Sequence, residues 1–237
     1  MLSIKNFSKD YGSKKKAVDN ISLEIESGDI FGFIGHNGAG KTTTLKCVAG
    51  ILDFTEGSVT IGGKSIKDDS IEAKKIIAYI PDNPDIYLNL TGIQYLNFIS
   101  DIYGISKEER EAKIKKYADT FELTSNLGDL ISSYSHGMRQ KLVLISAIIH
   151  NPKLLLLDEP FVGLDPISSH KLKEIMKEIC ENGGAIFFST HVLEVAEKLC
   201  NKIAIIKQGK IIKTGYTADV IGDESLEEVF LELTNNE

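Results

Sequence analysis

The sequence predicts an α/β fold: a mixed sheet core that carries an antiparallel β subdomain and a helical insertion. Three short apolar runs, Ile30–Ile34, Leu154–Leu157 and Ala185–Phe188, are typical of parallel strands covered on both faces. Apolar and polar residues alternate over Ile21–Glu26, which indicates a half-buried strand. Residues 88–150 carry helical patterns, and strands return after them. This order of elements predicts a sheet core interrupted by a helical subdomain.

The first third of the chain is expected to be mostly strands. An alternating pattern begins at Met1–Lys5, and further strands are expected at Val59–Ile61 and Ile76–Ile80. The two are separated by turn residues that begin at Gly62. A helix is expected over Lys41–Ala49, directly after a glycine-rich loop.

The middle of the chain is expected to be helical. Apolar residues over Ile114–Phe121 recur at the spacing of one buried helix face. Ser106 and Glu109 match a capping box at the start of that helix. The apolar residues of Tyr95–Tyr103 indicate another helix before it.

The last third returns to the alternating order of helices and strands. A helix is expected at Leu172–Ile179, a hairpin at Ile203–Ile212 and a short helix at Ser225–Leu233. Phe230 and Leu233 should pack that last helix onto the body. The whole chain is interpreted as one domain, with a core at 1–87 and 151–215, a helical subdomain at 88–150 and a tail helix within 216–237.

Composition excludes several classes of function. The formal net charge is −7, which argues against a general nucleic-acid binder or a polybasic membrane-surface protein. No apolar stretch reaches the ~20 residues that cross a bilayer. We therefore expect a cytoplasmic chain, with another chain supplying any membrane span. The cysteines, Cys47, Cys180 and Cys200, are far apart and are expected to be buried free thiols.

A phosphate-binding loop follows the strand at Ile30–Ile34. Residues 35–42 read GHNGAGKT, which matches G-x-x-x-x-G-K-[ST] between a strand and a helix. Glycines let the backbone wrap around phosphate oxygens, and the helix start faces the anion. Lys41 should neutralise the β- and γ-phosphates, and Thr42 should ligate Mg²⁺. The chain is thus predicted to be a P-loop NTPase of the RecA-like type. The expected nucleotide contacts from this loop are Gly35, Asn37, Gly38, Ala39, Gly40, Lys41, Thr42 and Thr43.

Two acids follow the next buried strand, at the edge where ligands bind a parallel sheet. Asp158 is expected to hold Mg²⁺ through its water shell, and Glu159 to orient or deprotonate the attacking water. His191 ends another core strand and is expected to contact the γ-phosphate or position the water. Lys41, Glu159 and His191 are therefore the predicted catalytic residues.

The segment at 134–141, YSHGMRQK, narrows the class of ATPase. It resembles the LSGGQ signature of ABC ATPases, and it precedes Asp158 at a spacing typical of that family. Gly163–Pro166 is similar to the family's D-loop, and Ser189–His191 to its H-loop. Tyr11 stands where the family has an aromatic residue that stacks on adenine. The resemblance covers nearly the whole chain.

This resemblance implies a head-to-tail dimer with two ATP molecules between the subunits. Each ATP would contact one subunit's phosphate loop and the other subunit's signature segment. Ser135 and Gly137 would contact the opposite γ-phosphate, and Asp165 would lie in the nucleotide site. The partner would be an identical chain or a related ATPase, and closure on ATP would drive the partner protein.

The chain departs from the family pattern in two places. His136 replaces the first glycine of the signature and is expected to face away, with a pH-sensing role as the alternative. Asp82 stands where the family has a glutamine that reaches Mg²⁺, so Asp82 is expected to meet the metal directly or through water. An acid at this position and the short tail helix resemble exporter ATPases of the ABC-2 kind.

The leading hypothesis is therefore an MgATP-hydrolysing subunit that powers a separate integral membrane permease, from the inner face of the membrane. A permease would dock at Asp82–Tyr103, where Ile86, Tyr87 and Leu88 form either a docking patch or part of the core. A soluble ABC ATPase of the iron–sulfur assembly type is the alternative. A third class, a nucleotide-gated module with negligible turnover, is disfavoured by Glu159 and His191.

Overall fold

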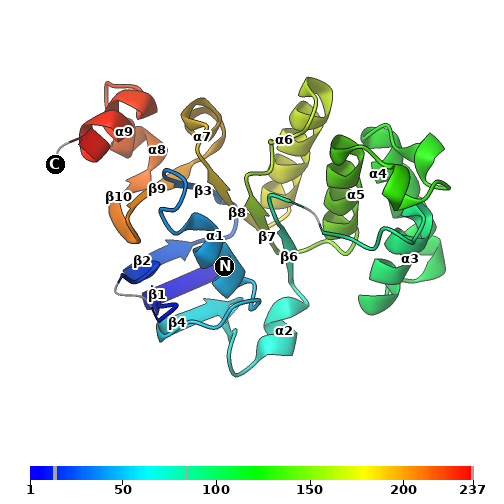
Figure 1. The fold of residues 1–237 in the computed structure, drawn as a ribbon, viewed down its shortest axis with the longest axis horizontal. Helices are drawn as coiled ribbons and strands as arrows, with labels where there is room; N and C mark the ends of the chain where they lie inside the picture. The colour runs from blue at the N-terminus through cyan, green and yellow to red at the C-terminus, as the bar shows by residue number, and fades with distance from the viewer. Residues whose placement is uncertain (13–14, 84, 236–237) are drawn as a thin grey trace.

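The computed structural model describes residues 1–12, 15–83 and 85–235. Two sheets carry the fold (Figure 1). The antiparallel sheet has the order β2 (Val18–Ile25), β1 (Leu2–Lys9), β4 (Glu56–Ile61) and β5 (Lys64–Ser65). The larger sheet has the order β10 (Lys210–Tyr216), β9 (Lys202–Lys207), β3 (Ile30–Ile34), β8 (Ala185–Thr190), β7 (Leu154–Asp158) and β6 (Ile77–Ile80). All neighbours in the larger sheet are parallel except β10, which pairs antiparallel with β9.

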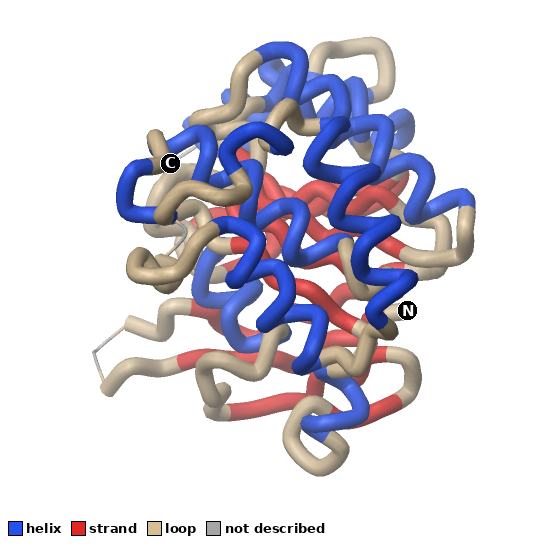
Figure 2. Tube along the Cα trace, turned by 90° about the vertical axis from the view of Figure 1, so that its right-hand side faces the viewer, coloured by secondary structure: helices blue, strands red, loops and turns tan. Residues whose placement is uncertain are grey.

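Helices cover both sheets, and a group of them stands apart from the strands. α3, α4 and α5 gather at one end of the molecule, beyond β6 and β7 (Figure 1). Viewed from that end, helices lie in front of the strands (Figure 2). The predicted mixed sheet, antiparallel β part and helical insertion are confirmed. The helices are α1 (Lys41–Val48), α2 (Ser70–Lys74), α3 (Gly92–Ile102), α4 (Lys107–Thr120), α5 (His136–Ile148), α6 (Pro166–Glu181), α7 (Leu193–Leu199), α8 (Thr217–Ile221) and α9 (Leu226–Asn235).

The leucines of β7 divide the interior into two clusters. Leu154 and Leu156 pack with the antiparallel sheet and α1, whereas Leu155 and Leu157 pack with the helical subdomain and α6. All four are fully buried. Successive side chains of a strand point to opposite faces, so a continuous apolar run serves both layers at once.

The helix caps differ from the predicted ones. Ser106 accepts the Glu109 backbone N–H at 3.3 Å, but the Glu109 carboxylate pairs with Lys113 at 2.6 Å. The reciprocal capping box lies instead at Thr91 and Gln94, at the start of α3. The Glu109 carboxylate pairs with the Lys113 ammonium, one helical turn later, rather than with the backbone N–H of the N-cap residue Ser106. Residues 216–235 also differ from a single tail helix, since they finish β10 and form both α8 and α9.

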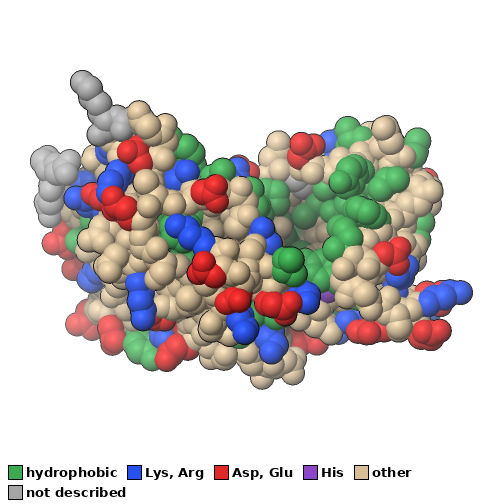
Figure 3. Space-filling view, turned by 90° about the horizontal axis from the view of Figure 1, so that it is seen from below, with side chains coloured by type: hydrophobic (Ala, Val, Ile, Leu, Met, Phe, Trp, Pro, Cys, Tyr) green, Lys and Arg blue, Asp and Glu red, His purple; other side chains and the backbone are tan. Residues whose placement is uncertain are grey.

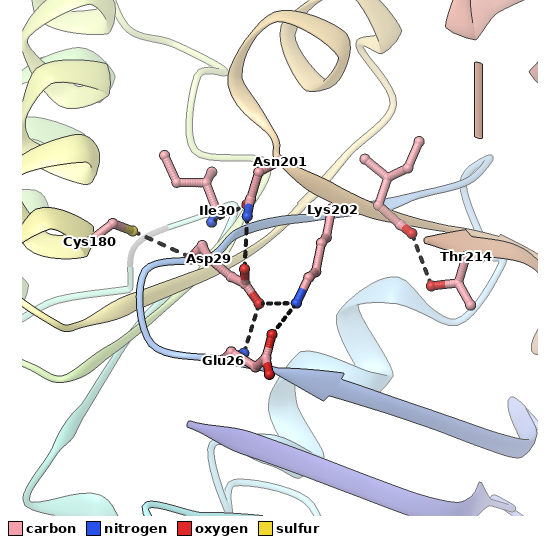
Figure 4. A network of polar contacts seen from close by, with 8 residues as sticks. Glu26, Asp29, Ile30, Cys180, Asn201, Lys202 and Thr214 are labelled. Carbon is pink, nitrogen blue, oxygen red and sulfur yellow. Dashed lines mark hydrogen bonds and ion pairs between the residues drawn. The ribbon is translucent and has the colours of Figure 1, made fainter. Parts of the chain in front are cut away.

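A polar network fixes the strand starts at the edge of the sheet opposite the phosphate loop (Figure 4). Asp29 is buried and accepts from Glu26 N at 2.7 Å, Asn201 Nδ2 at 2.8 Å and Lys202 Nζ at 3.0 Å. The Asn201 amide oxygen accepts from Ile30 N at 2.8 Å. The hydrogen bond to Glu26 raises the pKa of Lys202 against the opposing effect of burial. A buried carboxylate is stable only with such partners, so the network holds β3 and β9 side by side.

Candidate functional site

The segments that carry the predicted chemistry meet at one edge of the larger sheet. β3, β8 and β7 are parallel neighbours, so their carboxyl ends lie together. The phosphate loop follows β3, Glu159 follows β7, and His191 follows β8. Open α/β sheets bind ligands in the crevice outside the carboxyl ends of their parallel strands.

Lys41 lies at the centre of this group, with only 6% of its side chain exposed. Its ammonium donates to the Gly35 carbonyl at 2.6 Å and the His36 carbonyl at 3.3 Å. It also lies 3.6 Å from Oε1 of Glu159. Burial lowers the pKa of Lys41, and the charges of Glu159 and Asp158 oppose that shift. The ammonium is thus held in place by groups that a triphosphate can replace.

The loop around Lys41 is closely packed from outside. A side chain at Gly35 would collide with the carbonyl of Ile206, at the end of β9. The Gly209 N–H, in the β9–β10 turn, donates to the Ala39 carbonyl at 2.9 Å. Because the backbones at Gly35 and Ile206 approach each other so closely, position 35 requires glycine.

Asp158 is fully buried at the end of β7, beside the phosphate loop. Its Oδ1 accepts the Ser189 hydroxyl at 2.5 Å, and its Oδ2 has no partner. Burial raises the pKa of Asp158, while the hydrogen bond from Ser189 and the nearby Thr42 hydroxyl lower it. A buried carboxylate oxygen without a partner, next to the Thr42 hydroxyl, fits a hard cation such as Mg²⁺.

Within the described part of the chain, no three or more His, Cys, Asp or Glu side chains form a metal-holding group. Mg²⁺ commonly binds through one or two protein groups together with water and nucleotide phosphates. The donors present therefore suit a metal that arrives with the nucleotide.

Glu159 has an unusual backbone and two polar neighbours. Its φ of 49° lies in the left-handed region, which costs a non-glycine residue free energy and is concentrated at functional sites. Its N–H donates to both the carbonyl and the hydroxyl of Ser189, each at 3.2 Å. Its Oε2 lies 2.9 Å from Nδ1 of His191, and the His191 N–H approaches the same oxygen at 3.4 Å. The carboxylate is thus oriented between Lys41 and His191.

The predicted signature residues lie away from this group. Ser135 caps α5 by accepting the Met138 N–H at 3.2 Å. Gly137 is in the first turn of α5, and α5 stands among the helices at the right of Figure 1, apart from α1. The structure therefore brings Lys41, Asp158, Glu159 and His191 together but leaves Ser135 and Gly137 outside that cluster.

Asp165 connects the signature helix to the segment that follows Glu159. Its carboxylate caps α6 by accepting the Ser168 N–H at 2.8 Å, and it pairs with Lys141 of α5 at 2.8 Å. The hydrogen bond from Lys141 is the main cause that lowers the pKa of Asp165, with the Ser168 bonds next.

His136 is exposed, and one edge of its ring lies against the loop that follows Glu159. A Cβ at Gly163 would lie 2.7 Å from Cδ2 of His136, so the imidazole ring packs directly on the Gly163 backbone. Gly163 has a φ of 82°, in the left-handed region that glycine adopts without strain. A larger side chain thus fills the place of the usual signature glycine, and it does so against the same loop that holds Asp165.

Two further predicted residues lie at the borders of the site. Tyr11 is 57% exposed, and its hydroxyl lies 3.4 Å from Oγ1 of Thr43. The Lys9 ammonium lies 4.8 Å from the Tyr11 ring centroid. Asp82 is exposed just after β6, and its Oδ1 accepts the Asn83 N–H at 2.8 Å. Its role as a metal ligand stays a prediction.

Sequence reasoning missed the role of Ser189 and of Lys141. Asp158 pairs with Ser189 in the ladder between β7 and β8. The position of Ser189 within the predicted H-loop was visible, but its hydrogen bond depends on the strand register. Lys141 was visible only as the last residue of the signature segment.

Comparison with known proteins identifies the family. A model of the ABC transporter family matches residues 18–162. The chain belongs to the ABC transporter family. It is 32% identical to the ABC-type transporter ATP-binding protein EcsA of Bacillus subtilis (strain 168), over all of this chain and 98% of that protein. It is 35% identical to the linearmycin resistance ATP-binding protein LnrL of the same organism, over 93% of this chain and 70% of LnrL.

Solved structures agree with this assignment. A structure described as the ATP-binding subunit of an ABC transporter has a TM-score of 0.94 at 32% identity, with 99% of both chains covered. The ATP-binding cassette MJ0796, a dimer bound to ADP and Pi after hydrolysis, has a TM-score of 0.83 at 25% identity. That match covers 92% of this chain and 99% of MJ0796. The chain is an ATP-binding ABC ATPase. Among the helices of the described residues, none is long and apolar enough to cross a membrane.

Proposed function

We propose that this chain is the MgATP-hydrolysing subunit of a transporter and that it drives a separate membrane permease. The observation that carries the proposal is the position of Glu159, 3.6 Å from the Lys41 ammonium and 2.9 Å from His191 Nδ1. A carboxylate between a phosphate-binding lysine and a histidine is placed to act on a water molecule beside a γ-phosphate.

The residues of the site divide the chemistry between them. Lys41 exchanges its two carbonyl partners for phosphate oxygens and neutralises their charge. Thr42 and Asp158 would hold Mg²⁺, which supplies charge neutralisation for the phosphates when it is bound. Glu159 orients the attacking water and accepts its proton. His191 donates through Nδ1 to Glu159, which keeps the carboxylate in position and leaves Nε2 available for phosphate.

Dimerisation completes this site. Ser135 and Gly137 lie apart from the phosphate loop of their own chain, and their helix start suits an anion on another chain. The MJ0796 structure is a dimer bound to ADP and Pi, which supports a similar pairing here. In this arrangement Tyr11 stacks on adenine, and Asp165 lies at the interface. The second chain is an identical copy or a related ATPase.

An apolar surface on the helical side is the proposed docking site for the permease. Tyr87 and Phe98 are 61% and 42% exposed, and their rings contact each other edge to face at 5.8 Å. Leu88 is exposed beside them, whereas Ile86 packs against the core. The predicted patch is thus divided between surface and interior.

A groove lies at the C-terminal end of α3, the helix that carries Phe98. Seen from below, hydrophobic side chains gather around a hollow on the helical side of the molecule (Figure 3). The groove has a volume of about 620 Å³ between α2 and the end of α3, and Ile71, Ile102 and Tyr103 form its apolar lining beside charged residues such as Lys74 and Lys113. An exposed apolar surface of this kind marks a site of interaction with another protein. An apolar segment on the inner face of the permease would fill it, which places this chain on that side of the membrane.

We favour export as the direction of transport. LnrL, with which 93% of this chain aligns, is named for resistance to linearmycin. The acid at Asp82 and the helix α9 agree with the exporter resemblance.

Membrane association in the native cells tests the docking proposal. The share of the chain that sediments with membranes is measured for the wild type and for Tyr87→Glu combined with Phe98→Glu. We expect the wild type on the membranes and a severalfold smaller share for the double variant, because two charges would be buried in an apolar contact.

Leu231→Glu is the matched control, because it adds a charge at an exposed apolar position of α9, far from the groove. It should sediment as the wild type does. A wild-type chain that stays in the supernatant would contradict the permease partner. A double variant that stays on the membranes would contradict the assigned surface.

A further inference from the structure

The C-terminal helix α9 lies directly against the phosphate loop. The rings of Phe230 and His36 are 4.9 Å apart at their centroids with planes 65° apart, the edge-to-face contact that aromatic rings prefer. Phe230 is only 6% exposed, whereas His36 is exposed on the outer side of the loop. Figure 1 shows α9 near β9, on the side of the molecule opposite the helical subdomain.

A single hydrogen bond links His36, one partner of this contact, to the phosphate-binding Lys41. The carbonyl of His36 accepts the Lys41 ammonium at 3.3 Å. A ring that is fixed by Phe230 therefore restrains the same residue whose backbone positions Lys41. None of the sequence motifs includes Phe230, because it lies near the other end of the chain.

Other contacts anchor α9 and the outer side of the loop. Leu226 and Val229 are buried in the same cluster as Phe230. The Lys207 ammonium, at the end of β9, donates to the Thr234 carbonyl at 3.1 Å. The next turn holds the loop at a second point, through the bond from Gly209 N to the Ala39 carbonyl. The loop is thus supported from outside by both α9 and the β9–β10 turn.

We propose that Phe230 is a positioning residue for ATP: through the His36 ring, α9 holds the phosphate loop in the shape that receives the triphosphate. A loop that is ordered before binding does not have to be ordered at the expense of binding free energy. Loss of the ring contact lets the outer part of the loop, including the His36 carbonyl, take other conformations. ATP affinity then falls although no residue that touches ATP has changed.

The test is a double-mutant cycle on nucleotide affinity in the full chain. The dissociation constant of the Mg²⁺ complex of a non-hydrolysable ATP analogue is measured by calorimetry for the wild type, Phe230→Leu, His36→Ala and the double variant. Each single variant should weaken binding by about two- to tenfold, the range of one aromatic contact. The double variant should bind the analogue no more weakly than the single variant with the larger loss of affinity, because the two substitutions remove the same contact.

A matched control separates positioning from general stability. Val229→Ala shortens a buried side chain on the same helix, without a ring contact to His36. It should lower the Tm while leaving the dissociation constant unchanged. In steady-state ATPase assays, Phe230→Leu should raise KM and leave kcat within about twofold, as expected for lost binding that is equal in ground and transition states.

Because His36 is exposed, His36→Ala probes the contact even if Phe230→Leu lowers stability strongly. Unchanged affinity in His36→Ala would overturn the proposal. Additive losses in the double variant, or a loss in Val229→Ala that matches Phe230→Leu, would overturn it as well.

Discussion

Replacing Ser189 with alanine should destabilise the protein at Asp158. The Ser189 hydroxyl donates to the fully buried Asp158 carboxylate at 2.5 Å. A hydrogen bond to a charged group contributes about 1.5–3 kcal/mol. The Glu159 N–H loses its hydroxyl acceptor but keeps the Ser189 carbonyl at 3.2 Å. We therefore expect the free energy of unfolding to fall by about 2 kcal/mol, and the Tm to fall by about 4–8 °C for a chain of this size.

The same substitution should move the pH dependence of ATP hydrolysis. Burial raises the pKa of Asp158, and the Ser189 hydrogen bond lowers it, so the pKa rises further without the hydroxyl. A carboxylate binds Mg²⁺ only when it is deprotonated. The acid limb of the ATPase profile should therefore shift to higher pH.

The stability of the nucleotide-free protein should also depend on the protonation of Asp158. A carboxyl group whose pKa is raised by folding favours the folded state at low pH, and that contribution is lost as pH rises through the folded pKa. In Ser189→Ala this loss should extend to a higher pH than in the wild type.

Urea unfolding and ATPase rates across pH measure these effects. Ser146→Ala is the control, because the buried Ser146 hydroxyl donates to the neutral Val143 carbonyl at 2.8 Å in the helical subdomain. It should cost only about 0.5–1.5 kcal/mol and leave the pH profile unchanged. An unshifted acid limb in Ser189→Ala would refute the link between this hydroxyl and the charge of Asp158.

Three further variants test the rest of the site. Glu159→Gln should hydrolyse ATP at least about 100-fold more slowly and accumulate a dimer with ATP in size-exclusion chromatography; a monomer at saturating ATP would contradict the dimer. Lys41→Ala should lose most of its ATP affinity in calorimetric titration, and unchanged binding would remove the phosphate-loop assignment. Lys141→Gln should cost at most about 1 kcal/mol in urea unfolding at pH 7, because the side chain of its partner Asp165 is 44% exposed and solvent screens the pair. The pKa of Asp165 is lowered by this pair, so the wild-type advantage is present above the unfolded pKa and should fade below about pH 4; a difference that persists at low pH would point to another cause.

The strand ends of the site could be predicted because each lies within a local pattern. Asp158 follows four leucines, and Lys41 follows a strand and a glycine-rich loop, so alternation and spacing alone locate them. Their meeting follows from the parallel order of β3, β8 and β7, which places their carboxyl ends at one edge.

Contacts that depend on distant packing could not be predicted. The partner of Asp158 depends on the register that sets it opposite Ser189. The contact between His36 and Phe230 joins the two ends of the chain through a tertiary fold that no local pattern describes. The capping box failed at Glu109 because the rule ignores the competing Lys113 one turn later.

Element boundaries moved for a similar reason. β10 continues to Tyr216, beyond the predicted hairpin end at Ile212, because its pairing with β9 resumes after a register shift between Ile211 and Lys213. Such an irregularity interrupts the alternation of side chains on which strand prediction relies.

The leucine run of β7 also determines which face of the sheet carries the Asp158 carboxylate. Leu154, Leu156 and Asp158 occupy every second position and so share the face that carries α1 and the phosphate loop. Inserting one residue into this run would turn the carboxylate toward the helical subdomain and place a leucine beside the phosphate loop. Asp158 therefore faces the phosphate loop only while the alternation of side chains along β7 is preserved, so only insertions or deletions of an even number of residues would keep its orientation.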